Sequence, residues 1–335
     1  MNINIWLTNT CNLDCSYCYE ENKNSISMNS NVAESIICFI NKLNKIEKIN
    51  FHGGEPLLNF KIIKQIVDAL QEKQIKYSIT TNGTLLSEKI AIYFKENKFN
   101  ISISIDGNEY SHNLNRYYKD TSGSYSDSIN GLLILKKYFE NVRIRMTVCQ
   151  NTVSLLYENI LSIYMLGFYN VVPVLNFLEN WDENNINDYV NSMEKVLKYN
   201  LTNNINNNDI FTYFDSKPIN SNCDGLIDSI HINAEGNIYP CSYTVDNEKY
   251  LSGNVFTDIN YNVRDKIIIL AQHENSDCIG CNRYNYCAGT RCKLVNEVVN
   301  GDSDTPCQFF CTSENVGFRL NNIYKELILI ANKGE

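Results

Sequence analysis

The sequence lacks the features of a secreted or membrane-spanning chain. No stretch reaches about 18 consecutive apolar residues, the length that a transmembrane helix needs. The N-terminus, MNINIWLTNTCNLDC, has no basic start followed by an apolar run, which excludes a secretory signal. Basic residues are also few, because 29 Lys and Arg stand against 38 Asp and Glu, giving a formal net charge of -9. This balance argues against nucleic acid or a membrane surface as the main partner, and we expect a cytoplasmic protein.

Cysteine, in contrast, is abundant. The chain of 335 residues holds 13 cysteines, three near the N-terminus and eight in the last third. A chain of this length buries enough apolar surface to fold without disulfides, and clustered thiols in the cytoplasm more often bind metal. The other two, Cys38 and Cys149, fall in an expected helix and at an expected strand end, where we predict small buried hydrophobic side chains.

Short β-rich runs alternate with amphipathic helical patterns through the first half of the chain. The β-rich runs are 4–8, 48–52, 77–81, 101–105, 142–148 and 171–177. The helical patterns are 31–43, 60–70, 87–96, 127–138 and 153–166, with Ser87 as an expected N-cap and Gly167 as an expected stop signal. Because parallel strands need a helical crossover, this alternation predicts an α/β fold built of parallel βα units.

The pattern changes twice after the sixth run, which predicts a first domain over 1–180. Residues 181–222 hold one helix-like segment and the Asn-rich run TNNINNND, which predicts a bridging or linker region. Residues 223–311 are dense in Cys, Gly and Tyr, which predicts a second, loop-rich domain. A helical pattern at 313–332 predicts that the last segment, 312–335, forms a C-terminal helix.

Three cysteines follow the first β-rich run directly. Cys11, Cys15 and Cys18 form C-x3-C-x2-C in TNTCNLDCSYCYE, with Tyr17 just before the third. Three soft thiolates on one loop suit an iron–sulfur cluster, and they leave one iron of a four-iron cube open to bind a substrate or cofactor. The alternative for these residues is a structural zinc loop that lacks its fourth ligand.

This cysteine loop resembles that of the radical S-adenosylmethionine (SAM) superfamily, and the resemblance extends through the first half of the chain. In that family the open iron binds the amino and carboxylate groups of SAM, and one electron from the cluster cleaves SAM to a 5'-deoxyadenosyl radical. The resemblance implies a partial (β/α)6 TIM-like barrel with SAM-binding segments at its strand ends. These are Gly53, Gly54, Glu55 and Pro56 in GGEP, Thr81 and Asn82 in TTNG, and Ser102, Ser104 and Asp106 in SISIDG.

The placement of these segments agrees with physical expectation. In parallel α/β barrels, ligand sites gather at the carboxyl ends of the strands, where the loops meet. Arg143 and Arg145 share one face of the fifth run, so either is a candidate partner for the SAM carboxylate, with solvated surface arginines as the alternative. Leu175 and Phe177 are candidates to pack against adenine, with ordinary barrel core as the alternative.

Eight cysteines fall in the last third, in the arrangement C-x12-G-x4-C, then C-x2-C-x5-C-x4-C, then C-x3-C. The arrangement resembles the SPASM extension of radical SAM peptide-modifying enzymes, which carries up to two auxiliary four-iron clusters. The resemblance implies that the first auxiliary cluster is held by Cys223, Cys241 and Cys292. It implies that the second is held by Cys278, Cys281, Cys287 and Cys307.

Two features depart from the family pattern. Four residues separate Cys287 from Cys292 where three are common, which we interpret as a subfamily feature. Cys311 has no assigned place. Three alternatives are open for it: it completes the first auxiliary cluster, it replaces Cys307 as a ligand of the second, or it is free. If Cys311 is not a ligand, the first auxiliary cluster keeps an open iron, where a substrate cysteine would bind as a thiolate with a lowered pKa. The alternatives are clusters that only brace the domain or relay electrons, and a zinc ribbon.

The resemblance implies a SAM-dependent enzyme with three four-iron clusters that installs a Cys-derived thioether crosslink in a ribosomally synthesised peptide. Its expected partners are that precursor peptide with its leader and a flavodoxin- or ferredoxin-type electron donor. Since no recognition domain precedes Asn2, we also expect either a separate leader-binding protein or direct binding of the leader on the barrel edge. C–C crosslinking, epimerisation and formylglycine formation by a sulfatase maturase are alternatives, although Ser242 stands where the last family has an Asp base. A non-catalytic iron–sulfur protein that transfers electrons or binds a peptide is the alternative of another class.

Overall fold

The structure, a computed structural model, describes residues 1–18, 20, 26–43, 45–207 and 223–331. Within these ranges one eight-stranded sheet has the order β6–β5–β4–β3–β2–β1–β7–β8. Neighbouring strands pair in parallel from β6 through to β7, and β8 runs antiparallel to β7. The strands are β1 (Asn2–Trp6), β2 (Lys48–His52), β3 (Lys76–Thr81), β4 (Asn100–Ser104), β5 (Arg143–Val148), β6 (Val171–Leu175), β7 (Ser229–Ile232) and β8 (Ile238–Tyr239).

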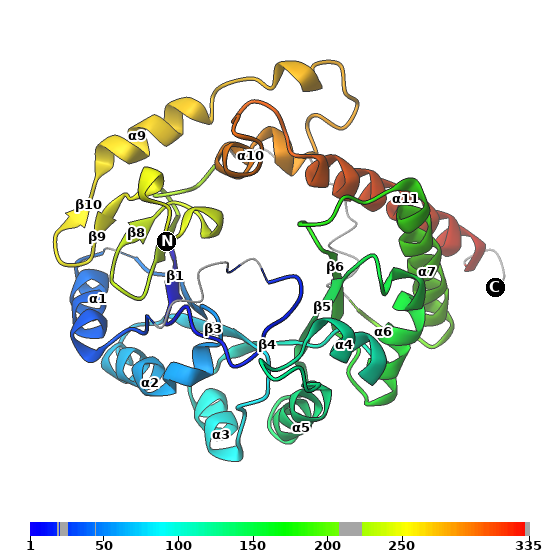
Figure 1. Ribbon diagram of the computed structural model, residues 1–335, viewed down its shortest axis with the longest axis horizontal. Coiled ribbons are helices and arrows are strands. Elements are labelled where there is room, and N and C mark those ends of the chain that lie inside the picture. Colours follow the sequence, from blue (N-terminus) through cyan, green and yellow to red (C-terminus); the bar gives the residue numbers. More distant parts are fainter. Residues whose placement is uncertain (19, 21–25, 44, 208–222, 332–335) are drawn as a thin grey trace.

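Helices link the parallel strands and cover the outer face of the sheet, which Figure 1 shows curving around the middle of the molecule. The α/β fold of parallel βα units is therefore confirmed. The sheet ends at β6 and β8, which pair with each other nowhere in the part of the chain that the structure describes. The helices of this part are α1 (Ser30–Lys42), α2 (Phe60–Ala69), α3 (Glu88–Glu96), α4 (Glu109–Asn115), α5 (Tyr125–Lys136) and α6 (Leu156–Met165).

The two faces of the sheet differ in polarity, because side chains alternate along each strand. Ile3 and Ile5 of β1 are fully buried in the core beneath the helices. Asn4, between them, faces the other way, and its Oδ1 accepts a hydrogen bond from Asn50 Nδ2 (3.2 Å). The Oδ1 of Asn50 accepts one from Ser78 Oγ (2.9 Å). The hydrophobic core thus lies between sheet and helices, and the inner face of the curved sheet is polar.

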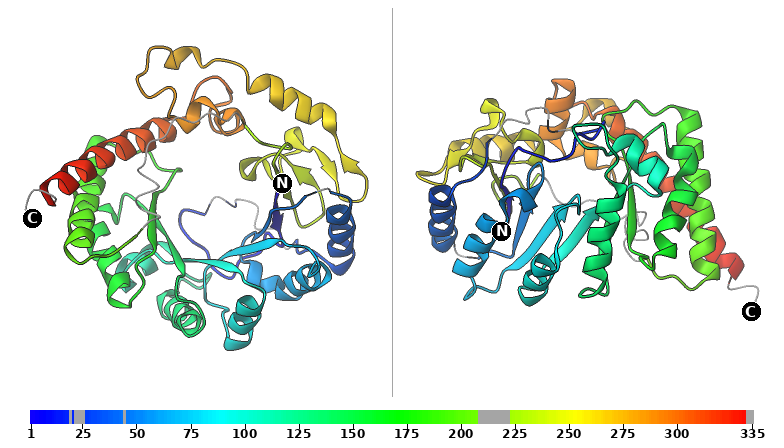
Figure 2. Two further views of the ribbon diagram at one scale, coloured as in Figure 1. Left: turned by 180° about the vertical axis from the view of Figure 1, so that it is seen from behind. Right: turned by 60° about the horizontal axis from the view of Figure 1, so that its bottom comes forward.

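The described residues after β8 run between the two edges of the sheet, from the α1 side to the α6 side (Figures 1 and 2). The C-terminal helix packs on α7, where Arg319 Nη2 donates to Asn187 Oδ1 (2.6 Å). The elements are α7 (Glu183–Thr202), β9 (Gly253–Asn254), β10 (Asp258–Ile259), α9 (Tyr261–Leu270), α10 (Lys293–Asn300) and α11 (Gln308–Ala331). Short 3-10 turns are η1 (Pro56–Asn59), η2 (Val153–Leu155), η3 (Ser242–Thr244), η4 (Glu248–Tyr250), η5 (Ser276–Cys278) and η6 (Ala288–Thr290).

Several local predictions can be compared with these elements. Ser87 caps α3, since its Oγ accepts from the N–H of Ile90 (3.4 Å), and Gly167 follows α6 with a φ of +82°, so both signals are confirmed. Cys149 is buried as predicted, whereas Cys38 is exposed, because α1 buries a stripe to which Cys38 does not belong. The C-terminal helix begins at Gln308, earlier than the predicted position 313.

The bridging region is only partly a linker. The helix-like segment predicted there is α7, a helix of 20 residues that packs against α6 and α11. Most of the residues after it, 208–222, lie outside the described residues. No helix of the described ranges is long and apolar enough to cross a membrane.

Candidate active site

The cysteine loop after β1 lies against the GGEP segment after β2. The N–H of Gly54 donates to Thr8 O (2.8 Å) and the N–H of Glu55 donates to Thr10 O (3.0 Å). A Cβ on Gly53 would lie 2.3 Å from Thr8 O, and one on Gly54 would lie 2.4 Å from Thr10 O. Gly53 also has a φ of +128°, which favours glycine. The two glycines therefore let GGEP approach the backbone directly before Cys11.

Glu55 joins the GGEP segment to the TTNG segment after β3. Its side chain is 1% exposed, and its carboxylate accepts from Leu57 N (3.0 Å), Thr81 Oγ1 (2.7 Å) and Asn82 N (2.7 Å). Burial raises the pKa of Glu55, against the hydrogen bonds that lower it. The carboxylate is thus committed to holding two strand ends together.

Asn82 connects TTNG to the first cysteine. Its Nδ2 donates to Asn12 Oδ1 (2.9 Å) and to Cys11 Sγ (3.8 Å), and the N–H of Leu13 also donates to Cys11 Sγ (3.4 Å). Burial raises the pKa of Cys11 to about 11. Since a metal binds the thiolate, cluster binding at Cys11 would release a proton, and the two donors would stabilise the resulting sulfur charge.

A buried charged group sits on the other side of the loop. Tyr17 OH donates to Asp106 Oδ2 (2.5 Å), and Arg116 Nη1 donates to Tyr17 OH (2.6 Å). Arg116 is 7% exposed, and its Nε has no hydrogen-bond partner among the described residues. Burial lowers the pKa of Arg116, but Cys15, Tyr17 and Asp106 together raise it well above its usual value. A permanent cation therefore lies beside the cysteine loop.

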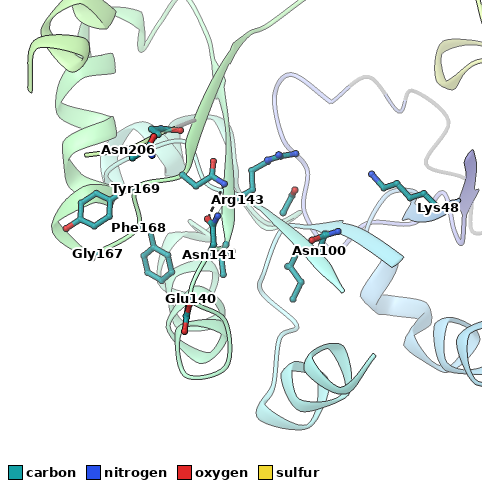
Figure 3. A pocket seen from close by; sticks show the side chains of 14 residues that line it. Lys48, Asn100, Glu140, Asn141, Arg143, Gly167, Phe168, Tyr169 and Asn206 are labelled. Carbon is teal, nitrogen blue, oxygen red and sulfur yellow. Dashed lines mark hydrogen bonds between the residues drawn. The ribbon is translucent and has the colours of Figure 1, made fainter. Parts of the chain in front are cut away.

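Arg116 lies at the end of α4, outside the motifs from which the site was predicted. Arg143, the first of the two predicted arginines, lies elsewhere. Together with Ser102, Arg143 lines a polar cavity of about 630 Å³ at the amino ends of the strands, the end opposite to the cysteine loop. Figure 3 shows Arg143 and Lys48 extending into this cavity from opposite sides. The structure thus does not bring Arg143 and Ser102 to the loop.

The remaining predicted residues divide between the inner face and the core. Arg145 and Ser104 are register partners on β5 and β4, and the charge of Arg145 reaches the interior, where it helps to lower the pKa of His52. Leu175, in contrast, is 3% exposed and packs in the core beneath the helices, so the barrel-core alternative holds for this side chain. Phe177 contacts Tyr243, with ring centroids 5.3 Å apart.

An aromatic group that the motifs did not indicate lines the inner face. The ring of Trp6 lies 4.7 Å from that of His52 and 5.3 Å from that of His231. Burial lowers the pKa of His52 to about 4 and that of His231 to about 3, with a further contribution from Arg145 at His52. Both imidazoles are therefore neutral at physiological pH. Because side chains alternate along a strand, the positions of the two histidines on β2 and β7 predict that both face inward, and this alternation could have identified them from the sequence.

The first auxiliary set predicted from the sequence comes together in space. Cys223, Cys241 and Cys292 line one cavity of about 220 Å³, although they come from a loop, the end of β8 and the start of α10. The turn at Cys241 is held by its N–H, which donates to Thr244 Oγ1 (3.2 Å). His231, from β7, also lines the cavity.

Cysteine thiolates are common ligands of iron–sulfur clusters, so the donor set of these residues fits such clusters. No three His, Cys, Asp or Glu side chains among the described residues converge as ligands of one ion. A four-iron cube does not require such convergence, because each thiolate binds a different iron. The number of clusters stays a prediction.

Sequence comparison matches the first half of the chain to a known protein family. Residues 5–163 match the family model of the Radical SAM superfamily. An uncharacterised protein of Methanocaldococcus jannaschii is 47% identical over 94 residues, which is 27% of this chain and 33% of that protein, so the chain spans about a third of this relative. A cysteine-type anaerobic sulfatase-maturating enzyme of Clostridium novyi is 26% identical over 351 aligned residues, covering 94% of this chain and 93% of that enzyme.

Solved structures share the fold over most of the chain. The structure of anSMEcpe with bound AdoMet and Cp18Cys peptide has a TM-score of 0.80 at 21% identity, covering 100% of this chain and 99% of that one. Streptococcus suis SuiB bound to the precursor peptide SuiA has a TM-score of 0.71 at 17% identity, covering 92% of this chain and 75% of that one. The region that matches the Radical SAM superfamily model, residues 5–163, contains the cysteine loop and the GGEP segment that packs on it.

Proposed function

We propose that this chain is a radical SAM peptide maturase that uses Cys11, Cys15 and Cys18 to hold the SAM-binding cluster. The observation that carries the proposal is the pair of backbone hydrogen bonds from Gly54 and Glu55 to the cysteine loop. They hold the GGEP segment beside three thiols at the carboxyl edge of a parallel sheet, where such folds bind ligands. When bound, the cluster and SAM supply a deoxyadenosyl radical.

The residues around the loop have separate tasks in this proposal. Arg116 is the cation that we assign to the SAM carboxylate, because it is buried beside Cys15 and keeps a free N–H. Tyr17 and Asp106 orient its guanidinium. The backbone of GGEP, with Thr81, Asn82 and Ser104, forms the rest of the SAM site, and Glu55 holds these strand ends in place.

We propose a ribosomally synthesised peptide as the substrate and a Cys-derived thioether as the product. Peptides are bound by anSMEcpe and by SuiB, the proteins whose structures resemble this one. His231, whose ring lies 5.3 Å from that of Trp6 on the inner face of the sheet, also lines the cavity of Cys223, Cys241 and Cys292, so the cavity adjoins this face. A cluster held by these three cysteines would accept the electron that remains when the crosslink forms. The electron donor and a leader-binding protein stay predictions.

Cleavage of SAM tests the enzymatic part of the proposal. Reconstituted protein reduced with dithionite should convert SAM to 5'-deoxyadenosine, and a variant with Cys11→Ala, Cys15→Ala and Cys18→Ala should not. A wild-type protein that binds iron but yields no 5'-deoxyadenosine would favour the non-catalytic iron–sulfur alternative.

A sulfatase maturase that forms formylglycine is the second candidate. Similarity to the Clostridium novyi enzyme along 94% of this chain favours it, whereas Ser242 in place of an acidic base argues against it. Mass spectrometry of a Cys-containing peptide separates the two. A thioether shows a loss of two hydrogens and one fewer alkylatable thiol, while formylglycine shows an aldehyde that reacts with a hydrazide probe.

A further inference from the structure

Cys307 and Cys311, near the start of α11, are both candidates for the fourth ligand of the second auxiliary cluster. Because the helix begins at Gln308, Cys307 directly precedes it and Cys311 lies one turn inside it. The two thiols lie in different surroundings. Cys307 is 4% exposed, and its N–H donates to Asn296 Oδ1 of α10 (3.4 Å), whereas Cys311 is exposed.

The face of α11 that carries Cys311 packs on the loop between two predicted ligands. Cys311, Glu314 and Phe318 follow each other at helical spacing and share this face. Glu314 accepts from Arg283 Nη2 (3.5 Å), and the guanidinium of Arg283 lies 4.6 Å from the ring centroid of Phe318. Arg283 stands between Cys281 and Cys287 in the sequence. The helix is therefore docked with Cys311 toward the C-x2-C-x5-C loop.

We propose that Cys311, in place of Cys307, is the fourth ligand of the second auxiliary cluster, beside Cys278, Cys281 and Cys287. The assignment rests on the proposed function, because it assumes that the second cluster exists. It removes Cys311 from the candidates for the first auxiliary cluster. The fourth position of that cluster is then left to Cys307 or to a substrate thiolate.

The test uses a full-length background that keeps only the second auxiliary site, with Cys11→Ala, Cys15→Ala and Cys18→Ala in the first loop and Cys223→Ala, Cys241→Ala and Cys292→Ala in the first auxiliary set. After anaerobic reconstitution this background should hold about four irons per chain. Adding Cys311→Ala should remove iron or leave a three-iron cluster with its own EPR signal. The matched control, Cys307→Ala, should keep about four irons and an unchanged spectrum. The opposite result, or two variants that both keep an unchanged cluster, overturns the assignment.

If both alanine variants lose iron, serine variants of the wild-type chain show which of the two cysteines coordinates the second cluster. An oxygen ligand changes the EPR g-values and the reduction potential of a cluster only where the residue coordinates iron. A change with Cys311→Ser alone supports the proposal, and any change of the second cluster with Cys307→Ser overturns it. A background that holds no iron overturns the auxiliary cluster itself, whereas retained iron with the opposite ligand overturns only the assignment.

Discussion

Gly54→Ala tests whether the close approach of GGEP to the cysteine loop is required. The added Cβ would lie 2.4 Å from Thr10 O, 2.6 Å from Thr10 C and 3.0 Å from Asn9 O. All three are backbone atoms, so no side-chain rotation relieves the contact. Ordinary contact begins at 3.4 Å, which requires a shift of about 1 Å between the two segments.

The expected loss combines two effects of that shift. Overpacking costs about 1–3 kcal/mol, and weakening of the Glu55 N–H bond to Thr10 O adds about 1 kcal/mol, so we expect about 2–4 kcal/mol of lost stability. A displacement of about 1 Å at a reacting group lowers a rate by about 100-fold. SAM cleavage by Gly54→Ala should therefore fall by a similar factor, because the displaced segment directly precedes Cys11.

Gly317→Ala is the matched control, since no heavy atom lies within 4 Å of the Cβ it would add in α11. Alanine in a helix interior should stabilise the protein by about 0.5–1 kcal/mol. Denaturant unfolding measures the stability of both variants, and 5'-deoxyadenosine release measures SAM cleavage. Equal stability and equal SAM cleavage in the two variants would refute the reasoning about GGEP.

Three further predictions concern the polar groups of the site. Glu55→Gln should destabilise the protein by about 1.5–3 kcal/mol in denaturant unfolding, because an amide N–H₂ would face a backbone N–H; a loss below about 0.5 kcal/mol contradicts the role given to the carboxylate. Arg116→Lys should weaken SAM binding about tenfold in calorimetry while Arg143→Lys leaves it unchanged, and equal effects would contradict the placement of the SAM carboxylate. His52, with its pKa lowered to about 4 by burial and by Arg145, stays neutral when folded and takes up a proton near 6.5 when unfolded. Its contribution to stability is therefore present at pH 7 and falls by about 2 kcal/mol as the pH drops to about 5, and unfolding of His52→Asn should lack that part of the pH dependence.

The positions of Arg143 and Cys38 could have been predicted correctly from the sequence. Arg143 is the second residue of the fifth predicted strand and the first of β5, and the amino end of a parallel strand lies opposite the edge where Cys11 to Cys18 must lie. The helical period of α1 likewise excludes Cys38 from the stripe formed by Val32, Ile36 and Ile40. In both cases the residue type suggested a role that the position in the element contradicts.

Other contacts depend on segments far apart in the chain. Arg116 meets Tyr17 across 99 positions, and nothing in the local pattern around either residue indicates the pair. The contacts of α11 also join distant segments, because Arg319 binds Asn187 of α7 and Glu314 binds Arg283. Such partners are chosen by how whole elements pack.

By itself the sequence determined the chemistry and the order of the elements. Cysteine spacing, the paired glycines of GGEP and the alternation of strands and helices are local patterns, and local spacing dictates which thiols share a loop and which strands run parallel. Only the tertiary structure decided which atoms of these segments make contact and that Arg116 joins them. Glu55, Asn82 and Arg116 reach the loop because the carboxyl ends of neighbouring strands are brought to one edge by the packing of helices on the sheet. That packing is a property of the whole buried core and is not written in any one segment.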